Sequence, residues 1–231
     1  MSNAYKILTL VIISAVIIAG IITPLPDIMN IQADKMDEGA FRQAAIFRVI
    51  FFHVPMAWLA VLAFLISMIH SVNHLRKNDL TYDTKAYSAA GIGFLFCFLA
   101  TITGSVWAKF QWGSFWNWDP RETSIFILLL IYGAYFALRS AIDSPEQRAK
   151  LSSVYAIIAF VTVPFFIFIM PRIVESLHPD PIINSKGKIH MNSKMLMIFI
   201  SSLVGFTLLF FWIYNLKIRS EILKHKKQLN D

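Results

Sequence analysis

Residues 49–71 read VIFFHVPMAWLAVLAFLISMIHS, 23 consecutive residues without an Asp, Glu, Lys or Arg. An α-helix needs about 20 apolar residues to cross the hydrocarbon core of a bilayer. Because lipid offers no hydrogen bonds, the backbone of a spanning segment must satisfy its own polar groups, which a helix does. We therefore interpret this stretch as a transmembrane helix.

Five further apolar runs flank this stretch on both sides. The whole chain is 57% hydrophobic and 15% charged, with a mean hydropathy of +0.60, a composition that a soluble domain of 231 residues could not bury. The sequence predicts an all-α integral membrane protein with six transmembrane helices, forming a single domain over residues 1–231. The other expected spans are 7–23, 87–106, 123–138, 154–172 and 195–214.

The first run follows Lys6 and could be read as a signal peptide. No small-x-small cleavage pattern follows it, and Pro24 ends the helix instead. We expect a retained transmembrane helix.

The basic residues predict the orientation of the six spans. An even number of crossings places both termini on one side, and twelve of the 21 Lys and Arg lie on that side, in shorter connections. The positive-inside rule makes this side cytoplasmic, and the net charge of +7 indicates topology and contact with the lipid bilayer, with no nucleic-acid motif beside it. The twelve are Lys6, Arg76, Lys77, Lys85, Arg139, Arg148, Lys150, Lys217, Arg219, Lys224, Lys226 and Lys227.

Several common chemistries are missing from the sequence. The single cysteine, Cys97, allows no disulfide framework, no CxxC pair and no CxxCH haem attachment site. There is no P-loop and no GxGxxG turn. These absences argue against an ATPase subunit and a dinucleotide enzyme.

The most unusual segment, WGSFWNWDPRET at 112–123, lies in the expected outer loop between the third and fourth spans. It carries Trp112, Trp116 and Trp118, which are either interfacial anchors or a platform for a planar ligand. The i, i+3, i+4 spacing of Trp112, Phe115 and Trp116 predicts a short surface helix that presents one aromatic face.

The end of this segment has the pattern of a helix start. Asp119 is a favoured N-cap residue, Pro120 is favoured at the first helical position, and Glu122 is placed to complete a capping box. Arg121 at the second position opposes the helix dipole, so capping does not explain it.

Two of the histidines lie at the expected outer ends of spans. His53 sits in an apolar stretch beside Pro55, which cannot donate to the carbonyl of Phe51, so we expect a kinked or locally opened helix there. His178 follows the fifth span. A neutral imidazole at such a depth is a ready metal ligand, and the two rings could approach the tryptophan segment from opposite sides.

Opposed imidazoles, flat aromatic side chains and scattered cations suit haem, which has two axial iron positions, a planar macrocycle and two propionates. Zinc would need three or four ligands close together. A b-type electron-transfer subunit would place paired histidines on facing helices near the bilayer centre, and a transporter would need charged residues or broken helices within the spans. The basic residues expected near the outer interface are Arg48, Lys109, Arg121 and Arg172.

The segment Trp112-Gly113-x-x-Trp116-x-Trp118-Asp119 resembles the tryptophan-rich "WWD" signature of the haem-handling family of cytochrome c maturation. The Phe-His-Val-Pro-x-Ala-Trp pattern at 52–58 and Ser-Leu-His at 176–178 are similar to the segments that carry that family's external haem-ligating histidines. In length and span number the chain looks like the haem exporter protein C (CcmC) type, and the resemblance covers essentially the whole chain.

The resemblance implies a bacterial inner-membrane protein, not itself an enzyme, that holds haem b non-covalently at the outer face. It implies His53 and His178 as axial ligands of the haem iron, and a porphyrin shelf of Trp112, Trp116 and Trp118. Arg121 would contact a propionate, and Asp119 would belong to the motif mainly as a helix cap. The implied partners are a periplasmic haem chaperone of the CcmE type and membrane subunits of the CcmA, CcmB and CcmD types.

An alternative comes from the ending Asp-Pro-Arg-Glu-Thr, at 119–123. It is similar to the Asp-Pro-Lys-Glu-Thr of the cytochrome c synthase branch (the CcsA type), whereas the exporter type usually has Asp-Ala-Arg-Leu-Thr. The alternative function is therefore a component of a cytochrome c haem lyase. Synthases of that branch carry more spans and a further histidine pair, which His70 and His74, on one helix face, could not supply to one iron.

Overall fold

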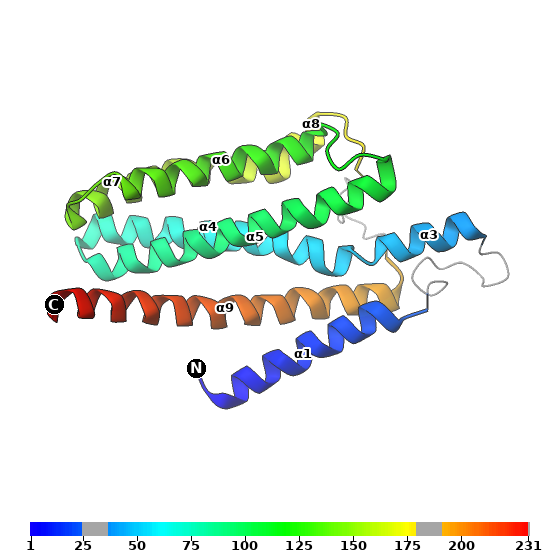
Figure 1. The fold of residues 1–231 in the computed structure, drawn as a ribbon, viewed down its shortest axis with the longest axis horizontal. Coiled ribbons are helices and arrows are strands. Elements are labelled where there is room, and N and C mark those ends of the chain that lie inside the picture. The colour runs from blue at the N-terminus through cyan, green and yellow to red at the C-terminus, as the bar shows by residue number, and fades with distance from the viewer. Residues whose placement is uncertain (25–36, 179–190, 231) are drawn as a thin grey trace.

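The fold is seen in a computed structural model that describes residues 1–24, 37–178 and 191–230. In these ranges six helices are long and apolar enough to cross a membrane, and they lie side by side in a bundle (Figure 1). The elements in chain order are α1 (Asn3–Ile22), α3 (Glu38–Phe47), α4 (Ile50–Lys77), α5 (Leu80–Trp112), α6 (Pro120–Ser140), α7 (Pro145–Pro164), the π-helical turn η2 (Phe165–Ile169), α8 (Met170–Ile173) and α9 (Ser193–Asn230).

The bundle has two ends. We call the end at which α5 finishes and α6 begins the Trp end, because residues 112–118 lie there. Helix α8 lies at the same end, and α1 begins and α9 finishes at the opposite end (Figure 1). Both termini are therefore on one side of the bundle, as six crossings require.

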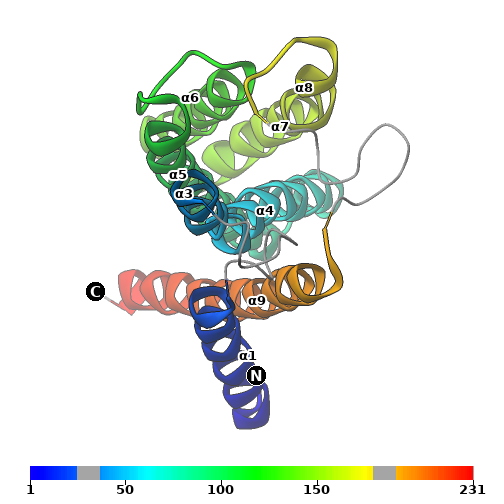
Figure 2. The same ribbon diagram turned by 90° about the vertical axis from the view of Figure 1, so that its right-hand side faces the viewer.

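Helix α4 is the centre of the packing, in contact with α5, α7 and α9, while α1 packs on α9 (Figure 2). In the core the rings of Phe64 and Tyr132 stack with their centroids 3.5 Å apart. At the end opposite the Trp end, Arg139 of α6 forms an ion pair with Asp83 of α5, with a shortest N–O distance of 2.6 Å. The part of the site that contains His53 lies between α4 and α5, a closely packed pair of helices.

The helices are longer than the apolar runs that predicted them. The third span was expected over 87–106, but α5 begins after the N-cap Asp79 and ends at Gly113, whose φ of 84° favours glycine. Hydropathy identifies only the part of a helix that meets lipid, whereas the helix ends where its capping residues are. Helix α3 was not predicted, because the apolar periodicity of residues 24–48 is too weak to indicate a surface helix.

Pro55 does not interrupt α4, which is continuous from Ile50 to Lys77. Proline cannot donate to the carbonyl of Phe51, four residues earlier, and Ser202 of α9 donates its hydroxyl to that oxygen instead. The carbonyl that Pro55 leaves free is therefore used in a hydrogen bond between two helices, α4 and α9. In α7, by contrast, Pro164 is followed directly by the π-helical turn η2, the kind of local adjustment that an internal proline favours.

Candidate functional site

His178 is held by a buried carboxylate. Its Nδ1 lies 2.8 Å from Oδ1 of Asp119. Asp119 is a buried residue, with an exposed fraction of only 3%. Ser176 donates its hydroxyl to the same carboxylate, 2.9 Å from Oδ2, and the backbone N–H of Leu177 donates to Oδ2 at 2.7 Å. Asp119 therefore binds all three residues of the Ser-Leu-His segment to the start of α6 through hydrogen bonds.

The helix start predicted for Asp119 is also present. Its side chain accepts from the backbone N–H of Arg121 at 2.9 Å, and Glu122 reaches back to complete the capping box. Burial by itself would raise the pKa of Asp119, but the backbone hydrogen bonds from Arg121 and Leu177, with His178 and Ser176, hold that pKa below its usual value. Asp119 thus remains an acceptor with two roles, of which the sequence predicted one.

This carboxylate fixes the chemistry of the imidazole. An ionised carboxylate only accepts hydrogen bonds, so Nδ1 of His178 carries the proton and Nε2 keeps its lone pair. Burial lowers the pKa of His178 from 6.5, although Asp119 acts in the opposite direction. At neutral pH the ring is therefore an uncharged nitrogen ligand with a defined tautomer, the arrangement in which metal-binding histidines are commonly held.

His53 is held at Nδ1 by a hydroxyl and not by a carboxylate. Its Nδ1 is 3.0 Å from the hydroxyl oxygen of Thr103, and that hydroxyl donates its own hydrogen to the carbonyl of Leu99 at 2.8 Å. This arrangement fits the Nδ1–H tautomer of His53, in which Nε2 carries no hydrogen. The ring also lies against Gly104, where an added Cβ would stand 2.9 Å from Cε1 of His53.

Helix α5 connects the two histidines. One turn beyond Thr103 and Gly104, which hold His53, it carries Trp107, whose ring is 5.5 Å from that of His178. Trp112 packs edge-to-face on His178 at 4.8 Å and on Trp107 at 4.8 Å.

The predicted tryptophan shelf is divided into two groups. Trp112 is the last residue of α5 and contacts His178, whereas Trp116 and Trp118 lie in the connection to α6 and pack edge-to-face on one another at 5.8 Å. The predicted surface helix through Trp112, Phe115 and Trp116 is wrong, because Gly113 ends α5 and residues 113–119 are not helical. The i, i+3, i+4 spacing was accidental.

The four candidate cations differ in what they contact. Arg48 donates to the last carbonyls of α1, including that of Thr23 at 2.7 Å, Lys109 to the carbonyl of Gly113 at 2.8 Å, and Arg172 to a carbonyl of η2. Arg121 is the one whose charge acts on His178 and opposes protonation of that ring.

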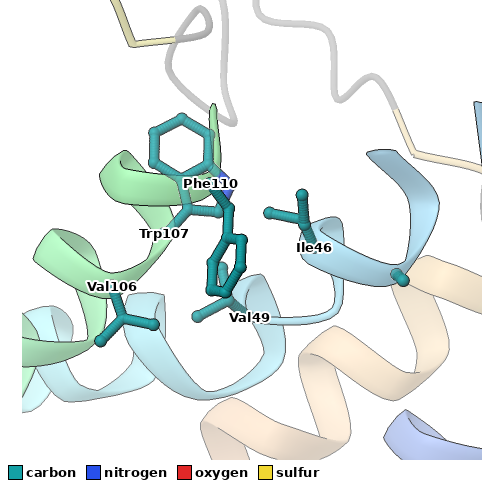
Figure 3. A pocket seen from close by; sticks show the side chains of 6 residues that line it. Ile46, Val49, Val106, Trp107 and Phe110 are labelled. Atoms are coloured by element: carbon teal, nitrogen blue, oxygen red, sulfur yellow. The ribbon is translucent and has the colours of Figure 1, made fainter. Parts of the chain in front are cut away.

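An apolar pocket of about 280 Å³ borders this site. Ile46 and Val49 form one wall, and Val106, Trp107 and Phe110 of α5 form the other (Figure 3). Trp107 therefore has a pocket beside it and His178 against its ring. Sequence reasoning missed Trp107 because the apolar run ended at 106, and it missed Thr103 and Gly104 because they lie inside a span.

The described residues contain no cluster of three or more His, Cys, Asp and Glu side chains that could hold a metal ion. What they contain is two imidazoles held by partners at Nδ1, His53 by Thr103 and His178 by Asp119, with Trp107 and Trp112 against the ring of His178. Fold and site together define a membrane protein with six candidate spans and with two histidines and several tryptophans towards one end of the bundle.

A family model described as heme exporter protein C matches residues 2–231. The chain belongs to the heme exporter protein C family. It is 32% identical to the heme exporter protein C of Bradyrhizobium diazoefficiens over 186 residues, which is 80% of this chain and 70% of that protein. It is 29% identical to that of Paracoccus denitrificans over 186 residues, 80% and 77% of the two chains.

The synthase branch is more distant. The cytochrome c biogenesis protein CcsA of Pelargonium hortorum is 35% identical to this chain, but over 98 residues, 42% of this chain and 30% of that protein. The Asp-Pro-Arg-Glu-Thr ending is thus a local likeness to the synthases in a chain whose full length matches the exporter family.

Proposed function

We propose that this protein holds haem at the Trp end, with His53 and His178 as the two axial ligands of the iron, and passes it on to a haem acceptor. The observation that carries the proposal is a hydrogen bond at Nδ1 of each ring, from His53 to Thr103 at 3.0 Å and from His178 to Asp119 at 2.8 Å, which leaves the Nε2 atoms as the candidate ligands. Haem bound there would supply the iron that both Nε2 atoms can ligate.

The aromatic and basic residues fit the rest of the molecule. Trp107 and Trp112, which pack around His178, offer ring surface to the macrocycle, and the apolar pocket beside Trp107 suits its hydrocarbon edge. Trp116 and Trp118 extend the aromatic surface along the loop. Arg121 would meet a propionate, the only strongly charged part of the ligand.

The orientation follows from the charges. Both termini lie at the end opposite the site, and the basic residues of the shorter connections and of the C-terminal tail gather there. By the positive-inside rule that end faces the cytoplasm of a bacterial inner membrane, so the Trp end faces the periplasm. The acceptor would be a periplasmic haem chaperone of the CcmE type, with CcmA, CcmB and CcmD-like subunits as membrane partners.

Bis-histidine ligation suits transfer better than catalysis. Both axial positions are filled by protein, so the iron has no open position for chemistry, and haem leaves when the acceptor's ligands replace these two. We infer that the chain is a haem-holding protein and not itself an enzyme.

The test is the visible spectrum of the purified protein with haem. The wild type should show a low-spin bis-histidine spectrum, and His53→Ala and His178→Ala should each lose it. Exogenous imidazole should restore it in either variant, because it replaces only the missing ligand. A low-spin spectrum unchanged in both variants would contradict the ligand assignment.

The synthase alternative requires a separate measurement. If this chain alone attached haem to a CxxCH apocytochrome in cells that lack the chaperone, the haem-lyase function would replace the one proposed here.

A further inference from the structure

Glu122 makes one hydrogen bond that a helix start does not require. Its Oε2 accepts from the backbone N–H of Asn117 at 2.7 Å as well as from that of Asp119 at 3.3 Å. A capping box uses only the second of these bonds. The carboxylate therefore bridges the two amides on either side of Trp118.

Trp118 has an unusual backbone conformation. In the described part of the chain, two residues other than glycine have a positive φ, Asn78 at 51° and Trp118 at 56°. Asparagine adopts this left-handed region readily, whereas a bulky aromatic residue does so at a cost in free energy. Such strain persists only where surrounding contacts impose it, and the amides on both sides of Trp118 are the ones that Glu122 holds.

The conformation displays the indole ring. Trp118 is 72% exposed, although tryptophan gains more than other residues from burial. Its ring packs edge-to-face on Trp116, which in turn packs on Phe126 at 5.9 Å. One member of the aromatic surface is thus fixed in place with its ring directed outward.

Helix stability alone does not explain a glutamate here. Its second oxygen, Oε1, is buried and has no hydrogen-bond partner among the described residues, which costs free energy that an apolar side chain would not lose. Asp119 already caps α6. The benefit that remains is the hold of Oε2 on the loop.

We infer that Glu122 is a positioning residue that keeps Trp118 in the left-handed conformation and thereby presents its indole to the bound macrocycle. The ligand in this inference, haem, rests on the proposed function, whereas the hold of Glu122 on the backbone around Trp118 does not. Without the bridge, Trp118 relaxes out of the strained region, and the apparent haem affinity falls with the fraction of protein in the competent conformation. We expect an affinity about tenfold weaker.

Three substitutions test the bridge. Glu122→Leu removes both hydrogen bonds, Glu122→Gln keeps an oxygen that can accept them, and Glu122→Asp keeps the charge at the helix start but withdraws the carboxylate by one methylene. The aspartate variant guards against misfolding of the leucine variant. The control is Glu146→Leu, which removes a first-turn glutamate from α7 at the opposite end.

Two measurements separate the geometry from the ligand. Fluorotryptophan is incorporated, and the ¹⁹F resonance of Trp118 is assigned by its loss in Trp118→Phe. We expect this resonance to shift or broaden in the leucine and aspartate variants of Glu122, and to stay in place in the glutamine variant and in Glu146→Leu. Haem titrations of the same proteins should show the tenfold loss in the first two variants and near wild-type affinity in the others.

Each outcome decides a different statement. A Trp118 resonance unchanged in both Glu122→Leu and Glu122→Asp overturns the positioning role, whatever the protein binds. A shifted resonance with unchanged haem affinity overturns the link to haem. If the wild type binds no haem, the proposed function fails, while the resonance still tests the bridge.

Discussion

Replacing Asp119 by asparagine tests whether this residue prepares His178 for the iron. The carboxylate oxygens now accept from three groups of the Ser-Leu-His segment, including Nδ1 of His178 and the N–H of Leu177. An amide has one acceptor oxygen, and its NH₂ group would face either Nδ1–H or the N–H of Leu177, donor against donor. Either the imidazole changes its tautomer or the segment moves.

The expected loss can be stated in advance. Removing the partner that orients a metal-binding histidine typically costs 10- to 100-fold in affinity, which is about 1.4 to 2.7 kcal/mol. Asparagine is as good an N-cap as aspartate, so the start of α6 should be affected little. Haem affinity should therefore fall in Asp119→Asn with only a small change in thermal stability.

The assay is a haem titration of the purified apoprotein followed by its Soret band, with thermal unfolding measured on the same samples. The matched control is Asp79→Asn. Asp79 is the N-cap of α5, and its side chain accepts from the N–H of Thr81 at 2.8 Å. This substitution should leave haem affinity unchanged.

The pH dependence provides a second readout. Burial lowers the pKa of His178, and Asp119 opposes that effect. Because iron binds the neutral ring, haem binding is present above this lowered pKa and is lost as the pH falls through it. Without the carboxylate the pKa should fall further, so Asp119→Asn should bind haem more weakly at neutral pH yet lose it at a lower pH than the wild type.

An Asp119→Asn protein with the haem affinity and spectrum of the wild type, and with the same loss of haem at low pH, would refute this reasoning. The carboxylate would then have no effect on His178 as an iron ligand. Equal losses in Asp119→Asn and Asp79→Asn would also refute it, since helix capping would explain both.

Two further substitutions test how the spans hold the site. Gly104→Ala would place a Cβ 2.9 Å from the ring of His53, so we expect haem affinity to fall at least about tenfold in titrations. The control is Gly133→Ala, whose Cβ would have nothing within 4 Å and which should change haem affinity little. Equal haem affinities in the two variants would contradict the close approach of Gly104 to His53. Ser202→Ala would leave the carbonyl freed by the proline of α4 unpaired, so thermal unfolding should show a loss of about 1–2 kcal/mol, against about 0.5 kcal/mol or less for Ser201→Ala.

Sequence reasoning could predict the six spans because lipid imposes a local requirement. Each segment must be long enough, apolar enough and internally hydrogen-bonded, and these properties can be read from one stretch at a time. The capping box at Asp119 and Glu122 was predictable for the same reason, since all its groups lie within four residues. The WWD resemblance then pointed to His53 and His178 as a pair.

The partners of those histidines could not be predicted in this way. Thr103 reaches His53 from 50 residues along the chain, and Asp119 reaches His178 from 59 residues away. Nothing in the pattern around Asp119 distinguishes a helix cap from a cap that also orients an imidazole. Trp107 was missed because hydropathy does not show how far a helix continues beyond the lipid.

The sequence by itself determined that this chain has six segments apolar enough to be candidate membrane spans, and its basic residues predicted the orientation. Only the tertiary structure decided which groups face Nδ1 of each histidine, which tryptophans contact His178, and that Trp118 has a left-handed backbone between two amides held by Glu122. The physical reason is range: crossing a bilayer depends on the properties of single segments, whereas a tautomer and a ring orientation depend on hydrogen bonds between segments.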